Sequence, residues 1–164
     1  MPFTPFHLGP GLLVGLLLFR FLDFPTFLLA SVVVDLEPFL VMLLNLDYPL
    51  HGFFHSFPGG SVAAFVLALA MSALRPSISD AVSVLRLKQG VSSRRVWAAS
   101  LLGICMHLLL DSPLYPGMKP FYPLAANPLL SGSMLIGFEI YTACAICFLL
   151  GIFLYVYRVL RVRR

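Results

Sequence analysis

The residues of this chain that could do chemistry are four histidines and a few carboxylates in otherwise apolar surroundings. His51 and His55 lie four residues apart in HGFFHS, and His107 lies four residues before Asp111 in HLLLD. Side chains four residues apart share one face of a helix, so each pair could present two ligands to one point. Imidazole together with carboxylate suits a metal ion, Zn2+ first and then Mn2+ or Fe2+.

Further candidates are His7, near the start of the chain, and the pair Asp35 and Glu37 within SVVVDLEPF. An unpaired carboxylate at the centre of a spanning helix costs roughly 2.5–3.5 kcal/mol, and a shared cation would offset that cost. Taken without the histidines, the same two carboxylates could form a proton relay or an ion path. Glu139 could be a ligand, the partner of a ligand or a hydrogen-bonding group between helices.

The composition places these residues in a membrane protein. Of the 164 residues, 60% are hydrophobic and 11% are charged, with a mean hydropathy of +0.95, which is typical of a chain with several membrane spans. The net charge of +4 does not indicate nucleic-acid binding, because most basic residues lie in two short blocks, Arg75–Arg95 and Arg158–Arg164. The expected partner is therefore a membrane lipid. Asp23 and Asp47 flank apolar segments and are expected to be solvated.

The apolar pattern predicts an all-α fold, a polytopic membrane helical bundle that forms a single domain over residues 1–164. About five transmembrane segments are expected, at Phe6–Phe21, Pro25–Leu44, Gly59–Leu74, Val96–Leu110 and Ser133–Val156. Thr4 is a candidate N-cap of the first helix, with Pro5 at its first position.

The second segment is predicted to be a broken helix. Pro38 lacks an amide donor and disfavours helix for the residue before it, so a distortion is expected around Asp35–Pro38. Asp35 and Glu37 would point apart on a regular helix, whereas a break at membrane depth usually lines a polar cavity. Both carboxylates could then turn toward one site.

Lysine and arginine predict the orientation in the cell (cytoplasmic) membrane. The positive-inside rule places the basic loop Arg75–Arg95 and the C-terminus in the cytoplasm, and the N-terminus outside. The loops Asn45–Pro58 and Ser112–Gly132 then also lie outside. All candidate ligands fall at mid-membrane or on its outer side, which supports one shared site.

The candidate metal ligands number more than one tetrahedral zinc requires. They are His7, Asp35, Glu37, His51, His55, His107 and Asp111. Such a set would suit two ions, which can bridge a hydroxide and clamp a phosphoryl group. Glu37, Asp35 and His55 are the candidate catalytic residues. Glu37, if uncoordinated, could act as general base or orient a ligand.

Up to about Leu130 the chain resembles the YdjM-like, LexA-regulated family of inner-membrane metal-dependent hydrolases. The matching pieces are TPFH with His7, Asp35-Leu36-Glu37, HGFFHS with His51, His55 and Ser56, HLLLD, and the later Gly117 and Tyr122-Pro123. Glu37 replaces the more usual second aspartate, and Phe54 replaces threonine. Gly52 stands where many members have an arginine that could clamp a phosphate. Lys119 could substitute for that arginine.

The order of histidine, aspartate, histidine and HxxxD is more distantly similar to zinc-dependent phospholipase C and the related single-strand nucleases. The HxxxE element of those enzymes has no counterpart here, which argues against a three-zinc centre. The resemblance implies a membrane-embedded metal-dependent hydrolase that acts at the outer side on a phospholipid or a small lipid-like phosphoester. Two alternatives remain: an ion or metal transporter with a site open to both faces, and a structural membrane protein stapled by a fully coordinated metal.

Overall fold

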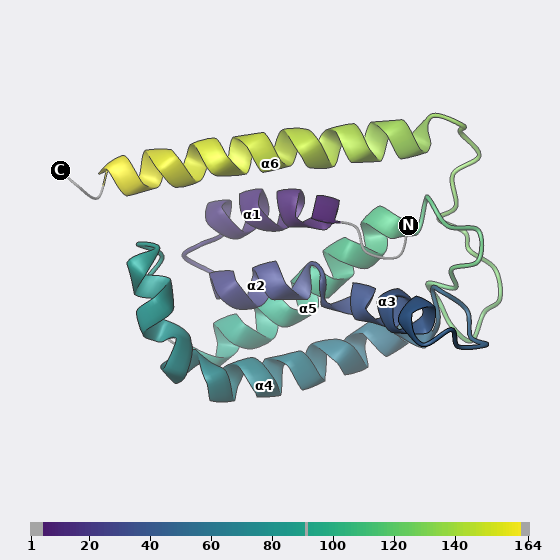
Figure 1. Cartoon of the computed structure of the whole chain (residues 1–164), viewed down its shortest axis with the longest axis horizontal. Helices are drawn as coiled ribbons and strands as arrows, with labels where there is room; N and C mark the ends of the chain where they lie inside the picture. Colours follow the sequence, from purple (N-terminus) through teal and green to yellow (C-terminus); the bar gives the residue numbers. More distant parts are fainter. Residues whose placement is uncertain (1–4, 91, 162–164) are drawn as a thin grey trace.

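The computed structural model of the chain is all-helical over the residues that it describes, 5–90 and 92–161, and confirms the predicted fold class (Figure 1). Its elements are the 3-10 turns η1 (Pro5–His7), η2 (Val33–Asp35) and η3 (Phe53–His55) and the α-helices α1 (Leu8–Leu17), α2 (Phe24–Ala30), α3 (Leu36–Leu43), α4 (Phe57–Val84), α5 (Ser93–Asp111) and α6 (Ile136–Arg161). Thr4, predicted to cap the first helix, lies outside the described residues.

The long helices form a bundle in which α1 packs along α6, and α5 packs against both α2 and α4. Helices α6 and α4 lie on opposite sides, with α1, α2 and α5 between them (Figure 1). One end of the bundle, here called the loop end, holds the loops 44–52 and 112–135. The other, called the basic end, holds residues 18–23, 85–90 and 155–161 (Figure 1).

Small side chains let the central helices approach closely. The core between α2, α4 and α5 consists of alanine and aliphatic side chains together with methionine. At Gly103 of α5, an added Cβ would lie 2.5 Å from the Cβ of Ala30 and 2.9 Å from the carbonyl oxygen of Phe27. A residue with a side chain would push the helices apart, so this glycine sets the spacing of α2 and α5 one turn before His107.

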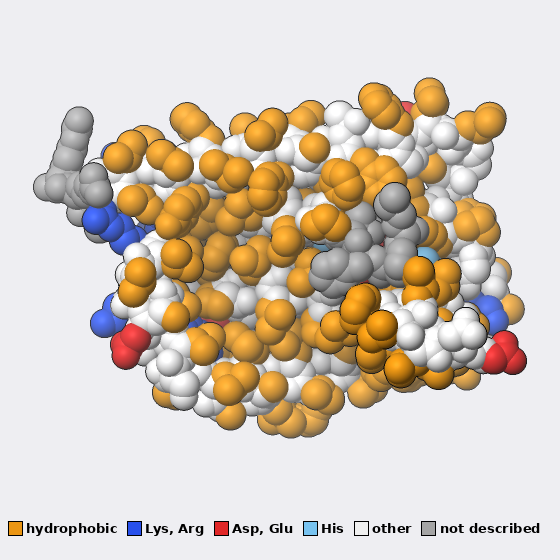
Figure 2. Space-filling view, in the orientation of Figure 1, with side chains coloured by type: hydrophobic (Ala, Val, Ile, Leu, Met, Phe, Trp, Pro, Cys, Tyr) orange, Lys and Arg blue, Asp and Glu red, His pale blue; other side chains and the backbone are white. Residues whose placement is uncertain are grey.

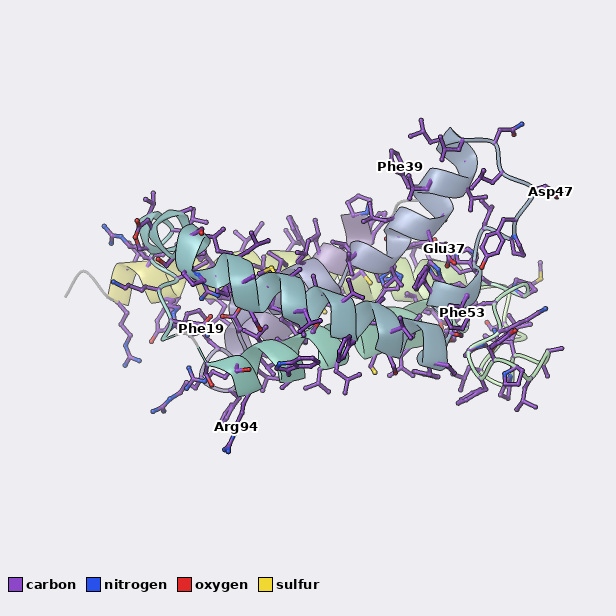
Figure 3. The ribbon with its side chains drawn as sticks, turned by 90° about the horizontal axis from the view of Figure 1, so that it is seen from below. Phe19, Glu37, Phe39, Asp47, Phe53 and Arg94 are labelled. Atoms are coloured by element: carbon purple, nitrogen blue, oxygen red, sulfur yellow. The ribbon has the colours of Figure 1, made fainter. Side chains whose placement is uncertain are left out.

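The second predicted segment is a broken helix, but the break lies earlier than the predicted position, Asp35–Pro38. Helix α2 ends at Ala30 and α3 begins at Leu36, with η2 between them. In a continuous helix the ring of Pro38 would clash with the carbonyl group one turn before it, whereas in the first turn of α3 its missing N–H costs nothing. The chain therefore breaks ahead of the proline, and α3 projects out of the bundle near Phe39 (Figure 3).

Among the described residues, three stretches are long and apolar enough to cross a membrane, namely Phe24–Leu43, Phe57–Val84 and Ile136–Arg161. The apolar stretch Pro5–Leu17 is shorter, and α5 is not among the three, so five full spans are only loosely supported. Hydrophobic side chains cover much of the visible face, and most of the visible charged groups lie near the two ends (Figure 2). Length and surface together make the chain a candidate membrane protein.

Helix α4 is longer than the predicted segment Gly59–Leu74, because it continues through Pro76 to Val84. Proline inside a helix removes one hydrogen bond and bends the axis without always ending the helix. The ribbon of α4 turns toward α6 near its C-terminal end (Figure 1). Part of the predicted basic loop is therefore helical.

Asp23, predicted to be solvated, is instead buried at the basic end with an exposed fraction of 1%. Its Oδ2 accepts a hydrogen bond of 2.7 Å from Nε of Arg75, which is equally buried. Its Oδ1 accepts hydrogen bonds from the backbone N–H and the hydroxyl of Thr26 and so caps α2. The prediction was wrong because the partner arginine lies 52 residues away and local sequence does not reveal it. Asp47 is exposed, as predicted.

Candidate metal centre

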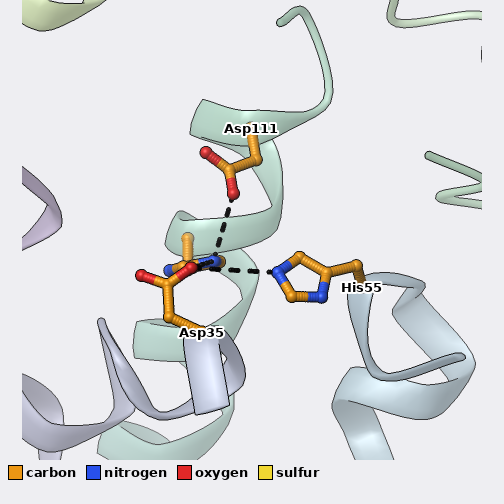
Figure 4. Close-up of side chains that lie close together, drawn as sticks. Asp35, His55 and Asp111 are labelled. Carbon is orange, nitrogen blue, oxygen red and sulfur yellow. Dashed lines mark ion pairs between the residues drawn. The ribbon is translucent and has the colours of Figure 1, made fainter. Parts of the chain in front are cut away.

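Four buried side chains from three elements meet at the loop end of the bundle. Asp35 ends the turn η2, His55 ends the turn η3, and His107 and Asp111 lie on the last turns of α5 (Figure 4). One ligand atom from each lies within 4.8 Å of the others, so the group could hold a metal ion. The predicted pairing of His107 with Asp111 on one helical face is thus realised.

The separations between the ligand atoms fit a shared ion. Nε2 of His107 lies 3.3 Å from Oδ2 of Asp111 and 3.6 Å from Oδ1 of Asp35, and Nε2 of His55 lies 4.0 Å from the same Oδ1. Ligands at the usual bond lengths around a tetrahedral zinc are about 3.3 Å apart. Only small side-chain movements would bring all four atoms to one ion.

The far nitrogen of each imidazole is held by a group that accepts a hydrogen bond. Nδ1 of His107 lies 2.9 Å from the carbonyl oxygen of Ser31, and Nδ1 of His55 lies 2.8 Å from Oε2 of Glu37. Because a carbonyl oxygen can only accept, Nδ1 of His107 donates and its Nε2 keeps a lone pair. The carboxylate of Glu37 acts on His55 in the same way, an arrangement typical of metal-binding histidines.

The atoms that face the centre lack other partners among the described residues. Nε2 of His55 and Nε2 of His107 are buried and without a hydrogen bond, as are Oδ2 of Asp35 and Nδ1 of His7 on the side of the site where these two atoms meet. A buried polar atom left in this way costs about 1–3 kcal/mol. A cation that accepts these lone pairs would remove the cost, and the donor set therefore fits a metal.

His7 contacts the opposite side of the same two carboxylates. Its Nε2 lies 3.1 Å from Oδ1 of Asp111, and its Nδ1 lies 3.8 Å from Oδ2 of Asp35. Its ring lies 4.1 Å from that of His107, centroid to centroid. Each aspartate thus has one oxygen near His107 and the other near His7, as carboxylates that bridge two ions do. The number of ions stays a prediction.

His51 lies beside this group and, within the part of the chain that the structure describes, forms no hydrogen bond or ion pair with its carboxylates. It precedes η3 in a non-helical stretch, so the predicted helical pairing with His55 is wrong. Its ring stacks on Tyr115 at 3.9 Å and meets the edge of His55 at 4.8 Å. Burial and, next, the nearby His55 lower the pKa of His51 to about 4, so it is neutral near pH 7. Glu139 is exposed in the first turn of α6.

Sequence patterns missed two groups that organise the site, the backbone carbonyl of Ser31 and the side chain of Tyr48. The Tyr48 hydroxyl accepts a hydrogen bond of 2.8 Å from the backbone N–H of Phe53 and lies 3.4 Å from Oε1 of Glu37. Its ring fills the space where a Cβ at Gly52 would lie, so Tyr48 occupies the place that a side chain at position 52 would take. Neither group belongs to a motif that could have indicated it.

Two cavities adjoin the centre. An apolar groove of about 570 Å³ runs between α3 and α4, with Glu37 and Tyr48 among its lining residues. A second cavity, of about 400 Å³, lies among the loops and is lined by Tyr48, His51 and Lys119. Tyr48 lines both cavities. Glu37 in the groove and His51 in the loop cavity each contact His55. Glu37 lines the groove and Phe53 lines the loop cavity, and both side chains are labelled in Figure 3.

No protein-family model, curated protein or solved structure matches the chain. Membership of the YdjM-like family stays a prediction based on its motifs.

Proposed function

We propose that the protein is a membrane-embedded metal-dependent hydrolase of a phospholipid or lipid-linked phosphoester. The observation that supports this most strongly is the pair of inward-facing imidazoles. Nε2 of His55 and Nε2 of His107 face Asp35 and Asp111, while the opposite nitrogens are held by Glu37 and Ser31. Burying this many polar groups at one point of an apolar bundle is costly unless they are paired or bind an ion.

Two imidazoles and two carboxylates favour Zn2+, with Mn2+ or Fe2+ as alternatives. A metal bound there would polarise a phosphoryl oxygen and lower the pKa of a bound water. Asp35, His55, His107 and Asp111 would hold it, and His7 is placed to add a ligand or hold a second ion. Glu37 would orient His55 by accepting a hydrogen bond from its Nδ1.

The two cavities support an amphipathic substrate. The groove between α3 and α4 has almost exclusively apolar walls and reaches Glu37, so it offers a place for an acyl or isoprenyl chain. The loop cavity contains Lys119, whose ammonium group suits an anionic phosphate, and His51, whose ring can donate one hydrogen bond. A phosphoester between them would lie next to His55.

Elemental analysis and hydrolysis assays on detergent-purified protein test the proposal together. We expect one or two equivalents of transition metal in the wild type, and less than about a tenth of that in His107→Ala and Asp111→Ala. Cleavage of phosphatidylglycerol in mixed micelles should fall in parallel. The matched control is Asp47→Ala, which removes an exposed carboxylate at the same end of the bundle and should change neither quantity.

Each contrary result has a distinct meaning. A wild type without metal after growth with added zinc would refute the metal site. If the wild type binds metal that the variants lose, but cleaves no phosphoester, the result would favour a structural membrane protein held together by the metal. Metal that exchanges from both sides of a sealed vesicle would favour the transporter.

A further inference from the structure

A second polar cleft lies at the basic end, away from the metal centre. Its volume is about 600 Å³, and its walls combine four cationic side chains with two aromatic rings and one amide. The cations are Arg20, Lys88, Arg95 and Arg158, which come from the α1–α2 turn, the α4–α5 loop, α5 and α6. None of the lining residues is acidic. Segments far apart in the sequence therefore converge on one concentration of positive charge.

The walls of this cleft are fixed by part-buried hydrogen bonds and by apolar packing. The side-chain amide of Gln89 donates to the carbonyl oxygens of Phe19 and Leu22, at 2.5 Å and 2.8 Å, and accepts a bond of 2.9 Å from the N–H of Phe24. Leu87 is buried against the same turn. The α4–α5 loop is thus anchored to the α1–α2 turn. The backbone at Lys88, next to Gln89, is therefore fixed beside the cleft.

Other contacts fix the remaining two cations. The guanidinium of Arg158 lies over the ring of Phe19 at 3.6 Å, which orients it toward the cleft. The carbonyl oxygen of Arg95 accepts a hydrogen bond from the N–H of Asp23, which ties the start of α5 to the same turn. The cleft is therefore preformed, which lowers the entropic cost of binding a ligand.

No described residue neutralises the positive charge of the cleft. Within residues 5–90 and 92–161, none of the four cations forms an ion pair. Arg75, at the same end, is by contrast paired with Asp23. Four like charges around one cavity repel each other, and an anion would relieve that repulsion.

We infer that this cleft binds the phosphate group of an anionic membrane lipid. Basic pockets between helices at the cytoplasmic surface are suited to such headgroups. The exposed ring of Phe21, at 71% exposed, and the hydrophobic surface of the bundle adjoin the cleft, so a headgroup could bind while its chains stay in the membrane. This inference does not depend on the proposed hydrolase activity.

Native mass spectrometry of the full-length protein in detergent, with added phosphatidylglycerol or phosphatidylcholine, tests the site. We expect the wild type to prefer phosphatidylglycerol, and Arg20→Gln combined with Lys88→Gln to weaken that binding about tenfold or more. Both residues are exposed, so folding should be unaffected. Metal content should also stay at the wild-type level, which separates this site from the metal centre.

The matched control removes two charges from the same end outside the cleft, with Arg86→Gln combined with Arg94→Gln. Both residues are exposed, and Arg94 projects away from the bundle (Figure 3). Unchanged lipid binding in this control would support the site. Equal loss in both double variants, or a wild type without preference for the anionic lipid, would overturn it. Displacement of the lipid by equimolar glycerol phosphate would overturn the membrane source and assign the cleft to a soluble phosphate.

Discussion

Whether a histidine can bind the proposed ion depends on which way its ring nitrogens point, and not only on its position in the sequence. The sequence identified all four members of the cluster by type, because histidines and carboxylates are rare in an apolar chain. It predicted both His51 and His55 as ligands, whereas the structure places His55 in the cluster and His51 beside it. Their placement depends on the stacking of His51 with Tyr115 and the contact of His55 with Glu37, and both partners lie outside any local pattern.

Glu37 should act by positioning His55. Glu37→Gln keeps the size of the side chain but replaces a charged acceptor with a weaker one, so Nδ1 of His55 is held less firmly and its Nε2 becomes less basic. We expect metal affinity to fall about 10–100-fold while the fold is retained. Competition for the metal with a chromophoric chelator measures this affinity. Glu139→Gln, at an exposed carboxylate, is the control, and equal affinity of wild type and Glu37→Gln would disprove the role.

At the scale of elements, two backbone features bring the ligands together. The break before Pro38 turns Asp35 into the bundle, and the close contact at Gly103 brings Ser31 within reach of His107. Proline rules predicted that a break would occur, although they placed it too late. The role of Gly103 could not be predicted, because a glycine in an apolar helix can equally be a simple packing residue.

Gly103→Ala should therefore disturb the metal centre from a distance. Its Cβ would meet Ala30 at 2.5 Å, so α2 and α5 must separate and the Ser31–His107 hydrogen bond must lengthen. We expect a loss of stability of about 1–3 kcal/mol and weaker metal binding. Thermal unfolding in detergent, with and without zinc, measures both. The control is Gly137→Ala, where the nearest atom to the new Cβ is 3.9 Å away. Equal melting temperatures for the two variants would show that the contact is unimportant.

At the scale of the whole molecule, the basic side chains and the candidate metal ligands lie at opposite ends of the bundle. The candidate ligands lie toward the loop end, and most of the arginine and lysine side chains lie at the basic end. Composition was sufficient to predict an all-helical membrane protein, because a mean hydropathy of +0.95 leaves few alternatives. The number of spans was harder to predict. Helix α1 has 10 residues, or about 15 Å, and cannot cross a bilayer core of about 30 Å by itself.

The orientation of the bundle decides which leaflet could supply a substrate, and the positive-inside rule predicts that the loop end faces outward. Single cysteines at exposed positions of the two ends test this in a background without Cys105, Cys144 and Cys147. We expect Asp47→Cys, at the loop end, to react with a membrane-impermeant maleimide on intact cells. Arg86→Cys, at the basic end, should react only after permeabilisation.

The cysteine-free protein without either new cysteine gives the background, and its metal content shows whether the centre survives the replacements. Labelling of Arg86→Cys but not Asp47→Cys in intact cells would invert the bundle. The metal centre would then open to the cytoplasmic leaflet, and the cationic cleft would face outward. Labelling of both positions in intact cells would mean that α4, the helix between Asp47 and Arg86, fails to cross. In that case the basic and loop ends would lie on one side of the membrane, and the groove between α3 and α4 would receive lipid from that side only.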